Sequence, residues 1–351
     1  MKAVVVHGAN DLRIDERPEP VAGPGEVVLD VEWGGICGSD LSYWRHGASG
    51  TAALKAPLVL GHEVAGRIAQ LGAGVENLDV GQPVTVHPAE LVGDGTMPER
   101  LKGRTNLYPN IRYFGSAAFD PHTDGGFSEL KLAKAWQIRP LPDGVDTLHG
   151  ALAEPLAVAM HAVGRAGSLR GRDVLVNGAG PIGSLVVAAA KYAGARSVIA
   201  TDINEASLRI ARAMGADEVR NVAGNGSLPE DMEVVFEASG VPAVLGGVLR
   251  ATARGGTLVQ VGNLPGAPSP AALGDLVTRE ITWIGSYRFV DEISDAVRAM
   301  AEGLDVSPVI THTFGIDEAA EAMRVSADPT SGSSKVMLRL GPTTTHPEGH
   351  Q

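Results

Sequence analysis

Cys37 is the only cysteine of the 351-residue chain, so it cannot form a disulfide within the chain. It lies in a glycine-flanked stretch, Gly-Ile-Cys-Gly, rather than in an apolar run, which favours chemistry over packing as its role. A second glycine-marked segment holds His62 and Glu63. Thiolate and imidazole suit Zn²⁺, and a catalytic zinc takes three protein ligands and one open position. The pattern therefore predicts a zinc site at Cys37 and His62, which one further carboxylate would complete.

A glycine-rich loop, Gly-Ala-Gly-Pro-Ile-Gly at 178–183, is the second place where chemistry is expected. It follows a buried-strand pattern at 173–177, opens an apolar helix, and leads to a strand pattern at 197–201 that ends at Asp202. This is the full dinucleotide fingerprint, with the phosphates on the free N–H groups at the helix start. Asp202 would bind the adenosine ribose hydroxyls, which favours NAD over NADP. The predicted cofactor-binding residues are Gly178, Gly180, Pro181, Ile182, Gly183 and Asp202, with Gly262 and Asn263 at the end of a later strand.

Two regions of different pattern must position these residues. The first is rich in glycine and in short alternating strands, which is typical of a small β-barrel, and the second alternates strands with helices. Strands are predicted at 3–6, 12–14, 27–31, 64–71, 84–86, 173–177, 197–201, 234–238, 257–261, 281–284 and 335–340, and helices at 151–164, 184–192 and 292–303. We therefore expect a first domain of residues 1–150 and 287–351, with a nucleotide-binding domain of residues 151–286 inserted into it. The tail from Gly341 is expected to be disordered.

The composition excludes several classes of protein. The formal charge of −12 argues against a nucleic-acid-binding protein, which needs a basic face. No run of about 18 apolar residues exists, so no membrane span is expected. With one cysteine and no export signal at the start of the sequence, the cytoplasm is the expected compartment.

Longer signatures resemble the zinc-dependent medium-chain dehydrogenase/reductase superfamily, and within it the polyol branch. They include the Cys37 and His62 segments and three further stretches, at 111–116, 121–127 and 153–159, and the likeness runs from Met1 to about Leu340. The resemblance implies an α/β protein with a GroES-like β-barrel catalytic domain and a Rossmann doubly wound nucleotide-binding domain. It implies a zinc- and NAD-dependent oxidation of a secondary hydroxyl. It also implies a homodimer or homotetramer formed along the strands at 257–261 and 281–284.

The resemblance assigns roles to residues around the metal. Ser39 matches the hydroxyl that starts a proton relay, and Asp40 matches a carboxylate that would orient the imidazole of His62. Either Glu63 or Glu154 would be the third metal ligand, directly or through water. Many relatives continue the relay with a histidine five residues after the cysteine, but this chain has Ser42 there, so the relay would pass through the NAD ribose or water.

The resemblance also implies a substrate site made by Tyr43, Phe114 and Arg288. A guanidinium suits a carboxylate, which would favour a sugar acid such as L-idonate over a neutral polyol. A salt bridge from Arg288 to the protein itself is the alternative. Rival interpretations of the whole chain are a dehydrogenase of sorbitol, xylitol or a secondary diol, a non-catalytic NAD-binding protein, and a zinc-free quinone reductase.

Residues 88–110 depart from the family pattern. Relatives often carry four cysteines there that hold a structural zinc, whereas this segment contains none. A four-cysteine site is therefore impossible, and we expect one zinc per chain. The segment must then be held by packing or by a subunit contact.

Overall fold

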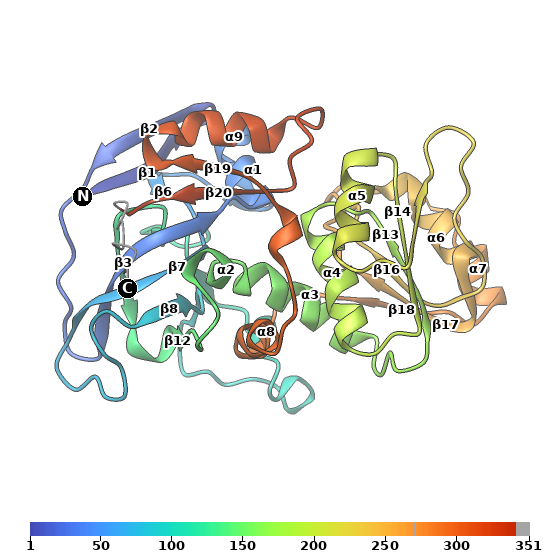
Figure 1. The fold of residues 1–351 in the computed structure, drawn as a ribbon, viewed down its shortest axis with the longest axis horizontal. Coiled ribbons are helices and arrows are strands. Elements are labelled where there is room, and N and C mark those ends of the chain that lie inside the picture. The colour runs from blue at the N-terminus through green and yellow to red at the C-terminus, as the bar shows by residue number, and fades with distance from the viewer. Residues whose placement is uncertain (270, 342–351) are drawn as a thin grey trace, which may run out of the picture.

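The computed structural model describes residues 1–269 and 271–341, so the tail beyond Gly341, for which disorder is predicted, lies outside the described residues. The chain forms two halves side by side (Figure 1). Strands from both ends of the sequence build one half, and the middle of the sequence builds the other. The division of the chain at about 150 and 286 stays a prediction.

The main sheet of the first half joins early and late strands. Its strands are β3 (Glu26–Gly35), β7 (Glu63–Leu71), β8 (Pro83–Val86), β11 (Leu130–Lys134), β12 (Ile138–Pro140), β19 (Ile310–Gly315) and β20 (Lys335–Arg339). Their order is β12-β8-β7-β3-β20-β19, and β11 pairs with the first part of β3. Since β20 pairs with the end of β3, Lys335 comes close to the segment that carries Cys37.

Smaller sheets and helices surround this one. A sheet in the order β2-β1-β6 contains β1 (Lys2–Gly8), β2 (Asp11–Glu16) and β6 (Leu58–Val59). Two short hairpins are β4 (Ala48–Ser49) with β5 (Ala52–Ala53), and β9 (Ala89–Leu91) with β10 (Ile111–Tyr113). The helices of this half are α1 (Gly38–His46), α2 (Thr147–Gly150), α3 (Ala153–Arg165), α8 (Glu292–Ala301) and α9 (Ala319–Ala327). Short 3₁₀ turns are η1 (Glu99–Leu101), η2 (Thr105–Leu107), η3 (Ala135–Gln137), η5 (Ser307–Val309) and η6 (Ile316–Glu318).

The second half is a parallel sheet flanked by helices. Its strands are β13 (Asp173–Asn177), β14 (Ser197–Asp202), β15 (Glu218–Asn221), β16 (Met232–Glu237), β17 (Thr252–Gln260) and β18 (Thr282–Gly285). They lie in the order β15-β14-β13-β16-β17-β18, which is the doubly wound arrangement that the sequence predicts. The accompanying helices are α4 (Pro181–Tyr192), α5 (Glu205–Ala213), α6 (Leu245–Ala251) after the 3₁₀ turn η4 (Pro242–Val244), and α7 (Gly274–Thr278).

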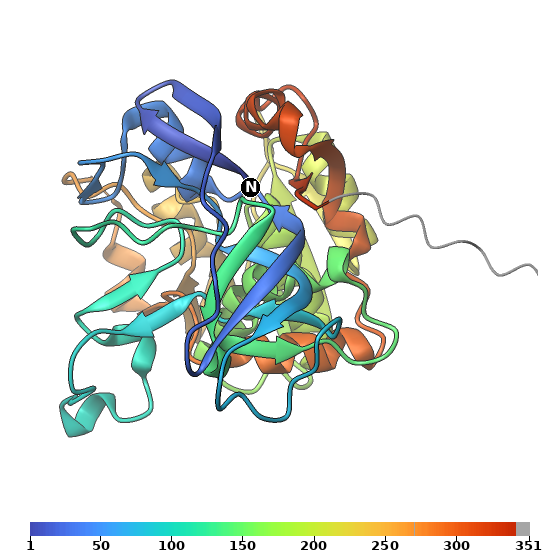
Figure 2. The same ribbon diagram turned by 90° about the vertical axis from the view of Figure 1, so that its left-hand side faces the viewer.

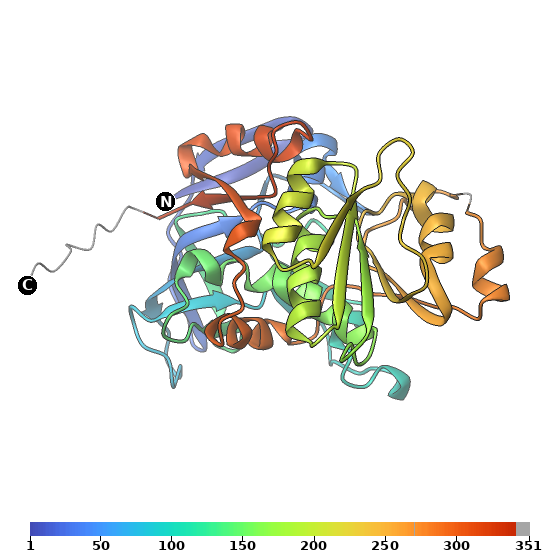
Figure 3. The ribbon, with the colours of Figure 1, turned by 45° about the vertical axis from the view of Figure 1, so that its right-hand side comes forward.

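Helix α3 lies between the two halves and contacts α4 on one side and α8 on another. Most of its buried positions are small or aliphatic, and residues such as Leu156, Ala159 and Ala162 are fully buried. The same apolar cluster continues through β13 and α4. The segment between β9 and β10 projects from the first half as a separate lobe, seen in teal in Figures 2 and 3.

Most of the predicted elements are present, and β13 has the predicted bounds. Helices α1, α5 and α9 and strand β19 were not predicted. No helix in the described part of the chain has the length and apolar character that crossing a bilayer requires.

Candidate metal centre and nucleotide site

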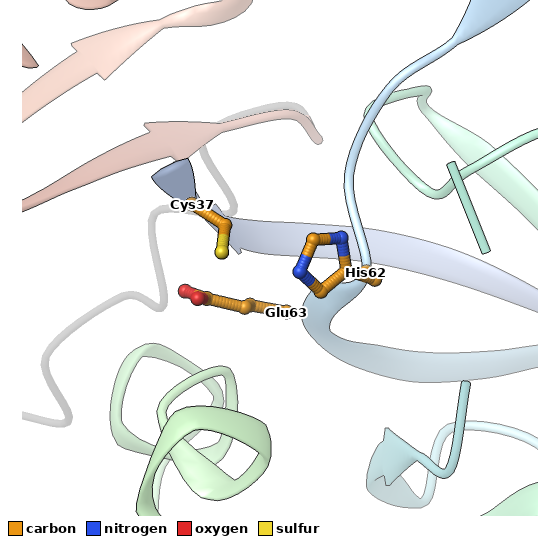
Figure 4. A group of neighbouring side chains, drawn as sticks. All are labelled: Cys37, His62 and Glu63. Atoms are coloured by element: carbon orange, nitrogen blue, oxygen red, sulfur yellow. The ribbon is translucent and has the colours of Figure 1, made fainter. Parts of the chain in front are cut away.

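The side chains of Cys37, His62 and Glu63 meet at the ends of β3 and β7 (Figure 4). One potential ligand atom from each lies within 4.8 Å of the other two. Among the described residues this is the one such group of three histidine, cysteine or acidic side chains. Cys37 is half-buried, whereas His62 and Glu63 are buried. The register of β3 against β7 pairs Gly35 with Glu63, which explains why residues far apart in sequence converge here.

Cys37 precedes helix α1, where the sequence pattern predicts only a glycine-rich turn. The carboxylate of Asp40 reaches back and accepts the N–H of Cys37 at 2.9 Å, as an acidic side chain does in the first turn of a helix. Its other oxygen accepts the N–H of Gly61 at 3.1 Å. The predicted role of Asp40 was to orient the imidazole of His62. Its hydrogen bonds in the described residues are instead to the N–H groups of Cys37 and Gly61, so Asp40 joins the cysteine segment to the histidine segment.

One member of this group of three, Glu63, forms a buried ion pair. The Nζ atom of Lys335 is 2.8 and 2.7 Å from the two carboxylate oxygens of Glu63 and 3.3 Å from the carbonyl oxygen of Ile36. Both side chains are almost fully buried, at 3 % and 1 % exposure. The Glu63 carboxylate fills the space where a Cβ on Gly35 would lie, so a side chain at Gly35 would clash with it. From the sequence, Lys335 is expected only as the start of a strand.

Glu154 lies in the first turn of α3, as predicted, and is buried rather than exposed. It lies outside the group of three, and it accepts a 2.6 Å hydrogen bond from the Tyr113 hydroxyl. The Tyr113 ring meets the His62 ring edge-on, with 5.6 Å between centroids. Arg288 stacks on the other side of this contact, its guanidinium carbon 4.1 Å from the Tyr113 centroid and 5.0 Å from that of Tyr287. In the described residues Arg288 forms no ion pair, so the alternative of a salt bridge to the protein is not found.

The buried charges at the site are unbalanced. The carboxyl groups of Asp40, Glu63 and Glu154 are buried beside the half-buried Cys37 thiol, and among the described residues the one ammonium paired with them is that of Lys335. Burial raises the pKa of Asp40, and burial together with the charge of Glu63 raises the pKa of Glu154. Burial alone would lower the pKa of His62, but Cys37, Asp40 and Glu154 raise it well above its usual value. A buried excess of acidic groups is costly unless a cation neutralises it, so the donor set and its charge fit a Zn²⁺ ion.

Two predicted substrate residues lie elsewhere. Tyr43 is 3 % exposed in the barrel core, where its hydroxyl accepts the N–H of Ala117 at 3.0 Å. Phe114 also belongs to this core, and the ammonium of Lys131 lies 4.1 Å from its ring centroid. Successive residues of an extended segment point to opposite faces, so the residue that faces His62 is Tyr113 and not Phe114. The role of Tyr43 and Phe114 at the substrate stays a prediction, and the structure adds Tyr113 as the residue of this segment that faces His62.

Ser39 is half-exposed in the first turn of α1, next to Cys37. Ser42, the residue at the position where many relatives would have a relay histidine, donates its hydroxyl to the carbonyl oxygen of Gly38 at 2.9 Å. Ser42 is therefore hydrogen-bonded within its own helix, and Ser39 stays the predicted relay hydroxyl.

The nucleotide loop has the predicted geometry. Helix α4 begins at Pro181, after Gly180, so the N–H groups of Ile182 and Gly183 lie in its first turn. A Cβ on Gly183 would overlap the carbonyl oxygen of Gly178, which is the close helix–strand contact that the motif requires. A Cβ on Gly180, by contrast, would meet open space on the side where a pyrophosphate would lie.

Acidic side chains at the carboxyl ends of the strands hold this loop. Asp202 accepts the N–H of Ala179 at 2.7 Å and that of Asn204 at 2.8 Å. Glu237, which the sequence pattern does not single out, is fully buried and accepts the N–H of Ser239 at 2.8 Å. Gly262 packs directly on the backbone of Gly240, and Asn263 follows it at the exposed edge of the sheet. The predicted cofactor residues thus lie along one edge.

Two family descriptions match the chain. Residues 23–143 match the "Alcohol dehydrogenase GroES-like domain", and residues 181–302 match "Zinc-binding dehydrogenase". The chain belongs to the zinc-dependent medium-chain dehydrogenase/reductase family, whose members are NAD(P)-dependent oxidoreductases that act on CH–OH groups. The expected pairing of a GroES-like domain with a Rossmann domain is therefore confirmed.

Individual relatives lie in the polyol and sugar-acid part of this family. Sorbitol dehydrogenase from Gallus gallus is 37 % identical over 359 residues, covering 98 % of each chain. L-idonate 5-dehydrogenase (NAD(P)(+)) from Escherichia coli is 35 % identical, covering 96 % of this chain and 98 % of the relative. The crystal structure of L-idonate 5-dehydrogenase from Escherichia coli superimposes with a TM-score of 0.90, covering 97 % and 98 % of the two chains. A second similar structure is the crystal structure of 2R,3R-butanediol dehydrogenase from Bacillus subtilis, which superimposes with a TM-score of 0.86. Its sequence is 29 % identical, and the match covers 96 % of this chain and 99 % of the Bacillus subtilis chain.

Proposed function

We propose that this enzyme oxidises L-idonate to 5-keto-D-gluconate and catalyses the reverse reaction, with NAD as cofactor and one zinc per chain. The observation that carries the proposal is the position of Arg288. Its guanidinium lies on the Tyr113 ring, which contacts the ligand His62, and it has no carboxylate partner in the described part of the chain. A free, planar donor fork beside the metal centre suits a substrate carboxylate.

The residues of the metal centre then have distinct roles. Cys37, His62 and Glu63 would hold the zinc, and Glu154, oriented by Tyr113, would face its open position through water. When bound, the zinc supplies a Lewis acid that favours deprotonation of the substrate hydroxyl, and NAD supplies the hydride acceptor. Ser39 would relay the hydroxyl proton, giving its own proton to water as it accepts that of the substrate, and Arg288 would fix the carboxylate end of the substrate.

A neutral polyol is the second candidate substrate. Sorbitol dehydrogenase from Gallus gallus is 37 % identical to this chain, and this overall identity is what supports a neutral polyol as the substrate. The two proposals differ in one respect: the sugar acid needs a cationic partner, whereas a neutral polyol gains nothing from a free guanidinium.

Replacing Arg288 by Met tests this difference. We expect the KM for L-idonate to rise about 10- to 100-fold, because a charge-assisted hydrogen bond contributes about 1.5–3 kcal/mol, while the KM for sorbitol changes little. Initial rates of NADH formation, with and without a zinc chelator, provide the measurement. The matched control is Arg112→Met. The guanidinium carbon of Arg112 also lies over an aromatic ring, 5.6 Å from the ring centroid of Phe119. Equal losses for both substrates would remove the argument for an acid.

The cofactor and assembly complete the proposal. Asp202 supports NAD over NADP, since its carboxylate would repel a 2′-phosphate, and the ratio of kcat/KM for the two cofactors measures this preference. A homodimer or homotetramer would form through β18, which lies at the edge of the nucleotide sheet, and light scattering on the purified enzyme tests it.

A further inference from the structure

The lobe between β9 and β10 carries a buried polar side chain, that of Asn106, in the 3₁₀ turn η2. Asn106 is only 4 % exposed, although it lies on a projecting segment. Its amide nitrogen donates to the carbonyl oxygen of Tyr287 at 2.7 Å and lies 3.4 Å from Nε2 of His161. One amide therefore joins the lobe to helix α3 and to the turn that carries Arg288.

The other atoms of this network fix the same turn. Nδ1 of His161 lies 2.7 Å from Oε1 of Glu292, at the start of α8. The second oxygen of Glu292 accepts the N–H of Val290 at 2.6 Å and that of Asp291 at 3.1 Å. Since Nε2 of His161 faces an amide N–H, it is the acceptor and Nδ1 carries the proton that the Glu292 carboxylate accepts. Asn106 and Glu292 thus hold the turn at its two ends.

The turn needs such support because Arg288 has an unfavourable backbone conformation. Its φ is +51°, in the left-handed region that a long side chain rarely adopts unless its surroundings impose it. The residues on either side of Arg288 are anchored by hydrogen bonds. The carbonyl oxygen of Tyr287 accepts from the amide of Asn106, and the carbonyl oxygen of Val290 lies 2.8 Å from Nε2 of His87. The left-handed residue directs the guanidinium onto the Tyr113 ring.

The same residues surround an apolar cavity of about 300 Å³. Tyr113, Arg288 and Asn106 all line this cavity. The side of Arg288 that faces the cavity is therefore not packed against core side chains. The rings of Tyr113 and Tyr287 contact the guanidinium, and the hydrogen bonds to the turn hold the backbone from which it extends.

We propose that Asn106 is a positioning residue for Arg288, and that through Arg288 it determines the selectivity for an acidic substrate. This inference rests on the proposed function, in which Arg288 binds the substrate carboxylate. It also gives the cysteine-free lobe a role, because the amide of Asn106 joins the lobe to the substrate site. Asn106 touches neither the metal ligands nor the nucleotide loop, so its removal should leave zinc and NAD binding intact.

The variant Asn106→Ala tests the proposal against the control Asn110→Ala, which removes an exposed asparagine from the same lobe. We expect Asn106→Ala to raise the KM for L-idonate about fivefold or more, because a displaced guanidinium loses alignment with the carboxylate. The kcat, the KM for sorbitol, the zinc content and the Kd for NAD should stay within about twofold, and Asn110→Ala should behave as the wild type. Equal changes for L-idonate and sorbitol, or a loss of zinc, would mean a merely structural role and would overturn the inference.

A double variant separates this inference from the proposed function. If Asn106 acts through Arg288, then Asn106→Ala should change the KM for L-idonate no further in an Arg288→Met background. If Arg288→Met raises the KM for L-idonate selectively but Asn106→Ala does not, the positioning role alone is overturned. No selective effect of Arg288→Met would overturn both proposals. Should Asn106→Ala fail to fold, the isosteric Asn106→Asp removes the donors while keeping the volume, and the same outcomes apply.

Discussion

The nucleotide site and the metal centre of this enzyme are built in opposite ways. The nucleotide loop occupies six consecutive residues, and its geometry comes mainly from backbone atoms and from the absence of side chains at Gly178 and Gly183, with one carboxylate, that of Asp202, bound to the N–H of Ala179. The metal centre comes from segments far apart, and the ion pair of Lys335 with Glu63 joins residues 272 positions apart. Its geometry depends on side-chain charges that compensate one another.

This difference determines how each site should fail. A loop built mainly from backbone contacts fails by steric overlap, which is local and independent of the metal. A centre built from buried charges fails when one charge is removed, because the remaining ones are left without partners. The variants below test this contrast.

The largest effect is expected for Cys37→Ser, which removes the soft ligand. Zinc should be lost and kcat/KM should fall about 10³-fold, as the loss of several kcal/mol of charge stabilisation implies. NAD binding should remain, because the nucleotide loop lies on a different sheet. Elemental analysis gives the zinc content, and fluorescence titration with NADH gives the affinity. Loss of NADH binding together with zinc would show that the two sites are not independent.

Lys335→Met tests the charge balance itself. It leaves Glu63 buried without its partner, so the free energy of unfolding of the zinc-free enzyme should fall by about 3–5 kcal/mol. Zinc should restore part of this loss, because the ion takes over the neutralising role. Urea unfolding with chelator and with added zinc gives both values. An equal loss under the two conditions would contradict a shared electrostatic role for Lys335 and the metal.

Gly183→Ala tests the backbone-built site. The added Cβ overlaps the carbonyl oxygen of Gly178, so we expect a loss of about 1–3 kcal/mol in stability and weaker NADH binding, with unchanged zinc content. The control is Gly164→Ala on the exposed side of α3, where a Cβ meets nothing within 4 Å. That change should be neutral or stabilising by up to about 1 kcal/mol. If Gly183→Ala bound NADH normally, the close contact would not be required for the loop.

The smallest effect concerns an exposed ion pair, Arg196 with Asp173, at 60 % and 35 % side-chain exposure. Hydrogen bonds from Arg196 and Ser197 lower the pKa of Asp173 from 3.8 to about 2. A lowered folded-state pKa contributes stability above the unfolded value of 3.8, and this contribution is lost as the pH falls toward 2. Solvent screening limits it to less than about 1 kcal/mol. Unfolding of wild type and Asp173→Asn between about pH 6 and 3 should show a small difference that shrinks with acid, whereas a difference independent of pH would exclude the ion pair as its cause.

The strand, loop and helix start that would form the nucleotide site were predicted closely from the sequence, because their signal is local. Strand β13 has the predicted bounds, and the loop after it has the predicted contacts. Cys37 and His62 were predicted as ligands with either Glu63 or Glu154 as the third, since ligand types are visible in a sequence, and the structure brings Glu63 together with Cys37 and His62. The partners that balance their charge were missed: the sequence shows Lys335 only as the first residue of an apolar strand, and nothing in it places that strand beside β3.

The substrate site was predicted only in part. Arg288 lies on the Tyr113 ring, next to His62, as its predicted place near the metal centre requires. Phe114 was the residue predicted from the neighbouring segment, whereas Tyr113 is the one that faces His62. A resemblance identifies a segment, but the alternation of side chains along a strand decides which residue faces the site. Asn106 was not predicted at all. An asparagine in a polar lobe carries no signal of burial, and only the fold brings it under the turn at Tyr287.

Helix α3 gives the two sites a common support. Its first turn holds Glu154 against Tyr113, and His161 two turns later faces Asn106 and Glu292. Another face of the helix packs on α4, whose first turn forms the end of the nucleotide loop. A rotation of the nucleotide domain that carries α4 would therefore shift the carboxylate at the metal and the histidine behind Arg288 in the same movement. Domain closure around a dinucleotide would be transmitted to metal and substrate through one rigid element, with no flexible loop in between.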